Sequence, residues 1–207
     1  MEPTKPLALQ TLPEIYQPQE TIDLSKQKKL ALGLNLAGMG LFVVIFFSFI
    51  FIVSIVRGLE SLPLFNITGS TEAWLFLLGI LGGFIALIVL HEAAHGLFFW
   101  IYTRSMPIFA MKLSYAYAAA PDWYIRRNAY RVVAMAPILI ITGLGLLICL
   151  FAPVSWLMGL ILFMSVNFAS AVGDLYVMLR LWKVPESTYI QDAGDRMTFF
   201  HERTEQS

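Results

Sequence analysis

Two histidines and one glutamate stand close together in an apolar part of the chain, in the order His91-Glu92-Ala93-Ala94-His95. A helical rotation of about 100° per residue places the two imidazoles about 40° apart on one face, so both can reach one metal ion. Glu92 lies about 60° from His95, where its carboxylate can contact a metal-activated water without being a ligand itself. These residue types in this spacing supply the chemistry that metal-assisted hydrolysis requires. A role in packing alone is disfavoured, because it would bury three polar groups at a high desolvation cost.

Asp174 is the better candidate for the third protein ligand that a catalytic zinc usually needs. It lies six residues from Arg180, about 9 Å by helical rise, and the centre of the histidine motif lies eleven residues from Arg104, about 16 Å. The two depths agree once helix tilt is allowed. The remaining histidine, His201, lies in the C-terminal tail and would have to fold back. The alternative roles for Asp174 are pairing with an arginine and a hydrogen bond between helices.

A polar stripe accompanies Asp174 on an otherwise apolar segment. Asn167, Ser170 and Asp174 follow the spacing i, i+3, i+7, which places them along one side of a helix. Facing a metal, Asn167 and Ser170 could orient its ligands or hold a substrate carbonyl. Such a stripe can equally serve as a hydrogen-bonding contact between helices.

The composition predicts an integral membrane protein. Apolar residues make up 58% of the 207 residues and charged residues only 14%, whereas soluble domains contain about 25% charged residues. The mean hydropathy is +0.71. The formal net charge is zero, which gives no basis for nucleic-acid binding through a basic face. The single cysteine, Cys149, excludes a disulfide framework and a thiolate metal cluster within one chain.

Long uncharged segments predict an all-α membrane protein with four transmembrane helices. The uncharged stretch 132–173 is too long for one span, and Pro153 is the natural place to divide it into a helical hairpin. A membrane domain is therefore expected over 30–182, between a partly ordered polar tail over 1–29 and a second polar tail over 183–207. The expected spans cover about 30–56, 73–102, 132–152 and 155–181.

Lys and Arg residues gather on the N-terminal flank, in the second loop and on the C-terminal side, while the first loop has only Arg57. By the positive-inside rule, both termini and the second loop are expected in the cytoplasm. Within that loop, Lys112 to Ala118 alternates between large and small side chains and predicts a short β-ribbon. This segment could receive an extended peptide as an added strand, or it could be an interfacial loop anchored by Tyr115 and Tyr117.

From about Gly83 to Phe200 the chain resembles the putative zincin peptidases, small bacterial membrane proteins related in plan to the site-2 proteases. The resemblance implies that His91, His95 and Asp174 bind zinc, that Glu92 is the general base, and that the bacterial inner membrane is the location. It rests on the following segments: His91 to His95, Tyr115 to Pro121, Arg126-Arg127, Ala136-Pro137, Asn167 through Gly173-Asp174, and Asp192 to Asp195.

Two hypotheses for the function follow. The first is a zinc-dependent intramembrane peptidase that acts on membrane-spanning or membrane-apposed protein or peptide substrates, with Glu92 as the general base. The second is a non-catalytic membrane protein that binds or transports a divalent metal. The second hypothesis accounts for the two histidines and Asp174 but gives Glu92 no distinct task.

Overall fold

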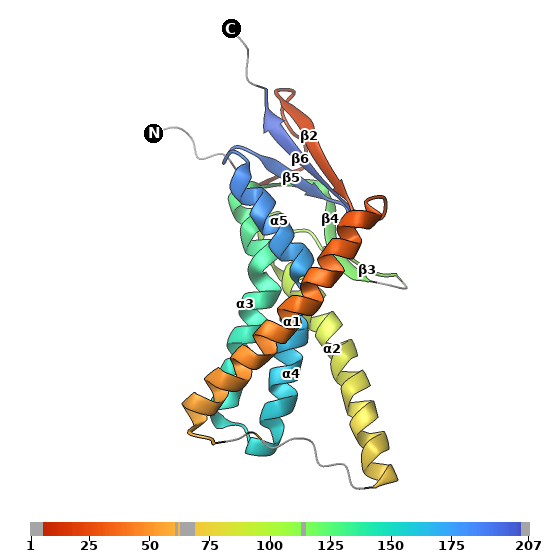
Figure 1. Ribbon diagram of the computed structural model, residues 1–207. Helices are drawn as coiled ribbons and strands as arrows, with labels where there is room; N and C mark the ends of the chain where they lie inside the picture. Colours follow the sequence, from red (N-terminus) through yellow and green to blue (C-terminus); the bar gives the residue numbers. More distant parts are fainter. Residues whose placement is uncertain (1–5, 61, 63–68, 113–114, 204–207) are drawn as a thin grey trace. The chain divides into compact units, whose positions relative to one another are not determined.

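A computed structural model describes residues 6–60, 62, 69–112 and 115–203. Its helices lie over the four predicted apolar ranges (Figure 1). Three of them, α1, α2 and α3, are long and apolar enough to cross a membrane, and α4 with α5 forms a bent pair that would make a fourth span. The bounds are α1 (Lys28–Arg57), α2 (Ser70–Thr103), α3 (Arg127–Phe151), α4 (Val154–Ser170) and α5 (Val172–Lys183).

The segment expected as one span over 155–181 is divided at Ala171 into α4 and α5. At this point the carbonyl of Asn167 accepts hydrogen bonds from the Ala171 N–H at 3.1 Å and from the Ser170 hydroxyl at 2.9 Å. A serine hydroxyl that bonds to a helix carbonyl favours a bend or an end of the helix. Gly173, which follows directly, has a low helix propensity. The break therefore has a local cause, and it leaves Asp174 in the first turn of α5.

The expectation of an all-α protein is wrong, because the described residues include a six-stranded antiparallel sheet. Its order is β1-β4-β5-β6-β2, with β3 paired to the remaining part of β4. A β-ribbon exists in the second loop as β3 and β4, but of the predicted segment Lys112 to Ala118 only 116–118 lie in a strand. Lys112 and Tyr115 lie between the two strands, and residues 113–114 lie outside the described residues. The strands are β1 (Ala8–Leu9), β2 (Tyr16–Asp23), β3 (Ile108–Met111), β4 (Ala116–Arg126), β5 (Tyr189–Asp192) and β6 (Arg196–Glu202).

Both polar tails supply strands to this sheet, so they are not merely partly ordered. Strand β2 buries Tyr16 and Ile22 while the residues between them are mostly exposed, which is how a strand covers a core with one face. Strand β2 lies beside β6 (Figure 1). The register of this pair sets Tyr16 opposite Glu202. Since β2 and β6 come from opposite ends of the sequence, no local sequence pattern predicts their pairing.

The chain forms two compact units, and the first contains residues 1–34, 92–136 and 173–207. Its core is built from the sheet and from the helix segments of the same unit. The Arg127 guanidinium donates to the Val184 carbonyl at 2.7 Å, and that of Arg131 donates to the Leu181 carbonyl at 3.0 Å. These contacts tie the end of α5 to the start of α3. The fully buried core side chains include Phe99, Ile125, Val133, Leu181, Ile190 and Phe199.

The second unit contains residues 35–91 and 137–172 and consists of helices in its described part. Its core includes Val53, Leu157, Ile161 and Met164. Arg57 ends α1, and its guanidinium donates to the carbonyls of Cys149 at 2.6 Å and Ala152 at 2.9 Å. The charge of Arg57 therefore satisfies carbonyls that the end of α3 leaves without helical partners.

Candidate metal centre

The structure brings His91, His95 and Asp174 together. Each offers one ligand atom, and these atoms all lie within 4.8 Å of one another. Both histidines are buried on α2. The Nε2 atom of His95 lies 3.4 Å from Oδ1 of Asp174. Two imidazole nitrogens and one carboxylate oxygen form a donor set that suits zinc.

The orientation of His95 is fixed by a backbone carbonyl of α3. Its Nδ1 lies 2.9 Å from the Val133 carbonyl oxygen, which can only accept a hydrogen bond, so Nδ1 carries the proton. In a regular helix this carbonyl would accept from the N–H four residues later, but residue 137 is a proline inside the helix and has no N–H. Pro137 therefore leaves the Val133 carbonyl available to His95. The Nε2 atom of His95, which faces Asp174, is then the nitrogen that can bind a metal.

The orientation of His91 is fixed by the buried amide of Asn167. The amide NH₂ donates to the Pro137 carbonyl at 3.3 Å, which sets the oxygen on the other side. That oxygen lies 3.0 Å from Nδ1 of His91, so Nδ1–H is the donor. Nε2 of His91 is again the nitrogen that can act as a ligand. Asn167 thus contacts a candidate ligand and is not a ligand itself.

The carboxylate of Glu92 lies at the edge of strand β4. Its Oε2 accepts a hydrogen bond from the Ala118 N–H at 2.7 Å. The Lys112 N–H donates to the Tyr115 carbonyl, so these two residues form a hydrogen-bonded pair of the β3–β4 ladder. In an antiparallel ladder such pairs alternate with pairs that share no hydrogen bond, and Phe109 with Ala118 is a pair of the second kind. Ala118 falls on a position whose N–H points away from β3. Glu92 therefore bonds to the edge of β4 that β3 leaves open.

Comparison with protein families identifies the chain. The family model described as "Putative zincin peptidase" matches residues 84–189, which include His91, Glu92, His95 and Asp174. The chain belongs to the putative zincin peptidase family. Comparisons with curated proteins and with solved structures gave no match.

Two other residues singled out from the sequence do not join the group of ligand atoms in this zincin-family chain. The Ser170 hydroxyl donates to the Asn167 carbonyl of its own helix, where it contributes to the end of α4. His201 lies in β6 opposite Gln17 of β2, and burial lowers the pKa of its imidazole. The sequence offered His201 and Asp174 as candidates for the third ligand. Of these two, the structure brings Asp174 close to His91 and His95.

Sequence reasoning missed a buried pair that connects the C-terminal sheet to α3. The Tyr130 hydroxyl donates to Oδ2 of Asp192, and the Gly194 N–H donates to Oδ1 at 2.8 Å. Burial raises the pKa of Asp192 to about 6. The sequence did point to Asp192, because the segment from Asp192 to Asp195 resembles that of the zincin peptidases. That resemblance did not indicate what Asp192 does. Pro137, inside the predicted span 132–152, was the sequence signal that the Val133 carbonyl lacks a helical partner.

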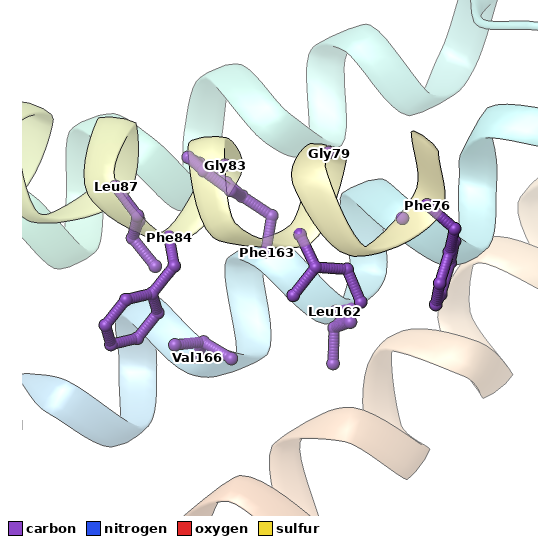
Figure 2. A pocket seen from close by; sticks show the side chains of 10 residues that line it. Phe76, Gly79, Gly83, Phe84, Leu87, Leu162, Phe163 and Val166 are labelled. Carbon is purple, nitrogen blue, oxygen red and sulfur yellow. The ribbon is translucent and has the colours of Figure 1, made fainter. Parts of the chain in front are cut away.

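An apolar pocket of about 300 Å³ lies along α2 and α4 in the second unit. Figure 2 shows side chains of Phe84 and Leu87 from α2 and of Val166 from α4 lining it. Leu87 precedes His91 by one helical turn, and Val166 precedes Asn167. In this member of the zincin peptidase family, the residues that line the pocket thus include close sequence neighbours of His91 and Asn167, but not these two residues themselves.

Proposed function

We propose that this chain is a membrane-embedded zinc metallopeptidase that hydrolyses peptide bonds in membrane-spanning or membrane-apposed substrates. The observation that carries the proposal is the grouping of His91, His95 and Asp174 on ligand atoms within 4.8 Å of one another. Membership of the putative zincin peptidase family supports the class of reaction. The three to four helices that could cross a membrane support the location.

The chain's own residues supply distinct parts of the reaction. Zinc, when bound by the two histidines and Asp174, would polarise a carbonyl and lower the pKa of a water molecule. Glu92 acts as the general base: its carboxylate takes a proton from the attacking water and returns it to the leaving amine. The Val133 carbonyl and Asn167 hold the two rings by Nδ1, so that Nε2 of each is the nitrogen that could bind the metal.

The open edge of β4 supports binding of the substrate as an extended strand. A substrate carbonyl could accept the Ala118 N–H that now donates to Glu92, as in other cases of strand addition. This exchange would release the Glu92 carboxylate for its role as base. An extended substrate is also required chemically, because a helical segment keeps its carbonyls in hydrogen bonds. The apolar pocket along α2 and α4 supports an apolar substrate segment.

We further propose a bacterial inner-membrane location with both termini in the cytoplasm and the sheet on the cytoplasmic side of the membrane. The distribution of Lys and Arg supports this orientation, because only Arg57 lies in the first loop. Fusion of an alkaline phosphatase or a fluorescent protein to the C-terminus tests it in bacteria. Fluorescence without phosphatase activity is expected, and the opposite result would reverse the proposed orientation.

The substitution Glu92→Gln tests the peptidase mechanism. The variant is expected to keep its bound zinc and to lose about 10²–10⁴-fold in the rate of cleavage of a membrane substrate, since it keeps the shape but not the basicity. Asp174→Ala is the companion variant and is expected to lose zinc. A Glu92→Gln protein with wild-type zinc content and wild-type proteolysis would show that the mechanism is wrong.

The rival function is metal binding or transport without hydrolysis. It has the same support from His91, His95 and Asp174 as the peptidase has. The two functions differ in what they require of Glu92. A metal carrier should tolerate Glu92→Gln in an assay of zinc uptake into vesicles, and wild-type protein should then show no proteolysis.

A further inference from the structure

Strand β3 and the residues that lead into it expose large apolar side chains outside the long helices. These side chains occupy both faces of the strand, since Ile108 alternates with Phe109 and Met111. A hairpin in water usually has one polar face. The exposed fractions are 81% for Met106, 50% for Ile108, 52% for Phe109 and 69% for Met111.

A contact with α2 places this strand at a defined height along that helix. The Phe109 ring packs against Gly96, and Cγ of Pro107 lies 3.2 Å from where a Cβ at Gly96 would be. Gly96 precedes Thr103, the last residue of α2, by seven residues, which is about 10 Å of helix. With 34 residues, α2 is about 51 Å long and exceeds a hydrocarbon core of about 30 Å by about 20 Å. A centred α2 therefore brings Gly96 to the boundary between hydrocarbon and headgroups.

Near the contact with β3, α2 also exposes apolar side chains. Leu97 and Trp100 lie on the last two turns of α2, which is a candidate span, and both side chains are exposed. The Arg104 guanidinium lies 5.9 Å from the Trp100 ring centroid, and the Lys112 ammonium lies 5.5 Å from the ring of Tyr115. Cations beside aromatic rings at the end of an apolar surface are typical of a membrane interface.

From these observations we infer that the segment from Met106 to Met111 lies in the bilayer, at the boundary between the headgroups and the acyl chains, beside the end of α2. This depth also accounts for the open edge of the strand. Among the described residues β3 pairs only with β4, so the backbone groups on its other edge need water. An open edge is excluded from the hydrocarbon core but is compatible with the hydrated boundary, where interfacial segments bury their apolar side chains. The occupant of this surface is lipid.

Depth measurements on the full-length protein in vesicles of phosphatidylethanolamine and phosphatidylglycerol test the inference. Single cysteines replace Met106 and Met111 in a Cys149→Ala background, and each carries an environment-sensitive fluorophore. Lipids with a spin label high on the acyl chain should quench both probes more strongly than lipids labelled near the chain end. The matched control is Gln17→Cys, because Gln17 is exposed on β2 of the same sheet. Its fluorophore should be quenched by neither lipid.

A second measurement separates lipid from other occupants. A membrane-impermeant maleimide should label cysteines at 106 and 111 at least about tenfold more slowly than a cysteine at 17, because a charged reagent is excluded from the boundary. Labelling as fast as at position 17 would place the segment in water and overturn the inference. Slow labelling without quenching by either lipid would show a protein contact, such as a second copy of the chain, and would also overturn it. Both readouts are independent of zinc and of peptide hydrolysis.

Discussion

Hydrogen bonds to the Nδ1 atoms decide which nitrogen each histidine offers to a metal. The Val133 carbonyl holds His95 at 2.9 Å, and the amide oxygen of Asn167 holds His91 at 3.0 Å. Such partners fix the tautomer and the ring orientation of a ligand. The candidate site is therefore pre-organised by groups that do not themselves bind the ion. This arrangement is expected of a metal site.

Asn167→Ala is expected to lower the affinity for zinc by about 10–100-fold, because His91 loses the acceptor that orients its ring. Competition between the protein and a zinc-chelating dye measures the change. Asn167→Asp retains an oxygen acceptor and should recover most of the affinity. Ser165→Ala is the matched control, since the Ser165 hydroxyl donates to the Ile161 carbonyl within α4. Equal affinities for wild type and Asn167→Ala would contradict the orienting role.

Asp192 makes the stability of the first unit depend on pH. Burial raises its pKa from 3.8 to about 6, so the folded protein favours the protonated carboxyl. Its contribution to stability is therefore fully present below about pH 4 and is lost as the pH rises through about 6, by about 3 kcal/mol in all. Asp192→Asn cannot ionise and should lack this loss. Thermal unfolding of the zinc-free protein between pH 4 and pH 8 measures it, and parallel curves for wild type and variant would refute the prediction.

At the scale of the element, Pro137 links the geometry of α3 to the histidine motif of α2. A proline inside a helix costs stability, about 3 kcal/mol, because it removes a hydrogen bond and crowds the preceding turn. Here the lost bond frees the Val133 carbonyl for His95. Pro137 thus lowers the stability of α3 but allows the orientation of His95, a candidate ligand. Such local losses of stability are expected at functional sites.

Pro137→Ala is expected to move stability and zinc affinity in opposite directions. The new N–H can bond to the Val133 carbonyl, which should raise the unfolding temperature of the zinc-free protein. His95 would then share its acceptor, and zinc affinity should fall by about tenfold. Thermal unfolding and zinc competition on the same preparation measure the two effects. A purely structural role for Pro137 would instead leave the zinc affinity unchanged while the stability moves.

The elements that could be predicted from sequence are those whose signals are local. The spacing of His91 and His95 is a property of one helix. Asp174 could be predicted as the third ligand because its distance from Arg180 along the helix gives its depth in the membrane. The sheet could not be predicted in the same way, because β2 pairs with β6 from the far end of the chain. Only the ribbon in the second loop, whose strands are close in sequence, was expected. Pro137 makes the Val133 carbonyl available, but its bond to His95 was missed because the sequence does not show that α2 and α3 bring the two groups together.

At the scale of the whole molecule, the described residues form two hydrophobic cores that share no residue. The first unit uses Phe199 of β6, which is fully buried against Ile190 and Leu181. The second uses Leu157 of α4, which is fully buried among Val53 and other apolar side chains. Each unit is assembled from segments that are far apart in sequence. Separate cores imply that a cavity in one unit should weaken that unit first.

Phe199→Ala and Leu157→Ala form a matched pair that tests this independence. Phe199→Ala should destabilise the first unit by about 3–5 kcal/mol, and Leu157→Ala should destabilise the second by about 2–5 kcal/mol, because each leaves a cavity in its own core. Hydrogen exchange of the protein in lipid nanodiscs, resolved by peptide, measures the opening of each unit separately. Faster exchange in Phe199→Ala should be confined to the sheet and its neighbouring helix segments, and in Leu157→Ala to residues 35–91 and 137–172. If either substitution accelerates exchange equally in both units, the two cores unfold as one cooperative structure. In that case the division into separately stable units is wrong, and a change in the sheet would reach the helices of the second unit through that cooperativity.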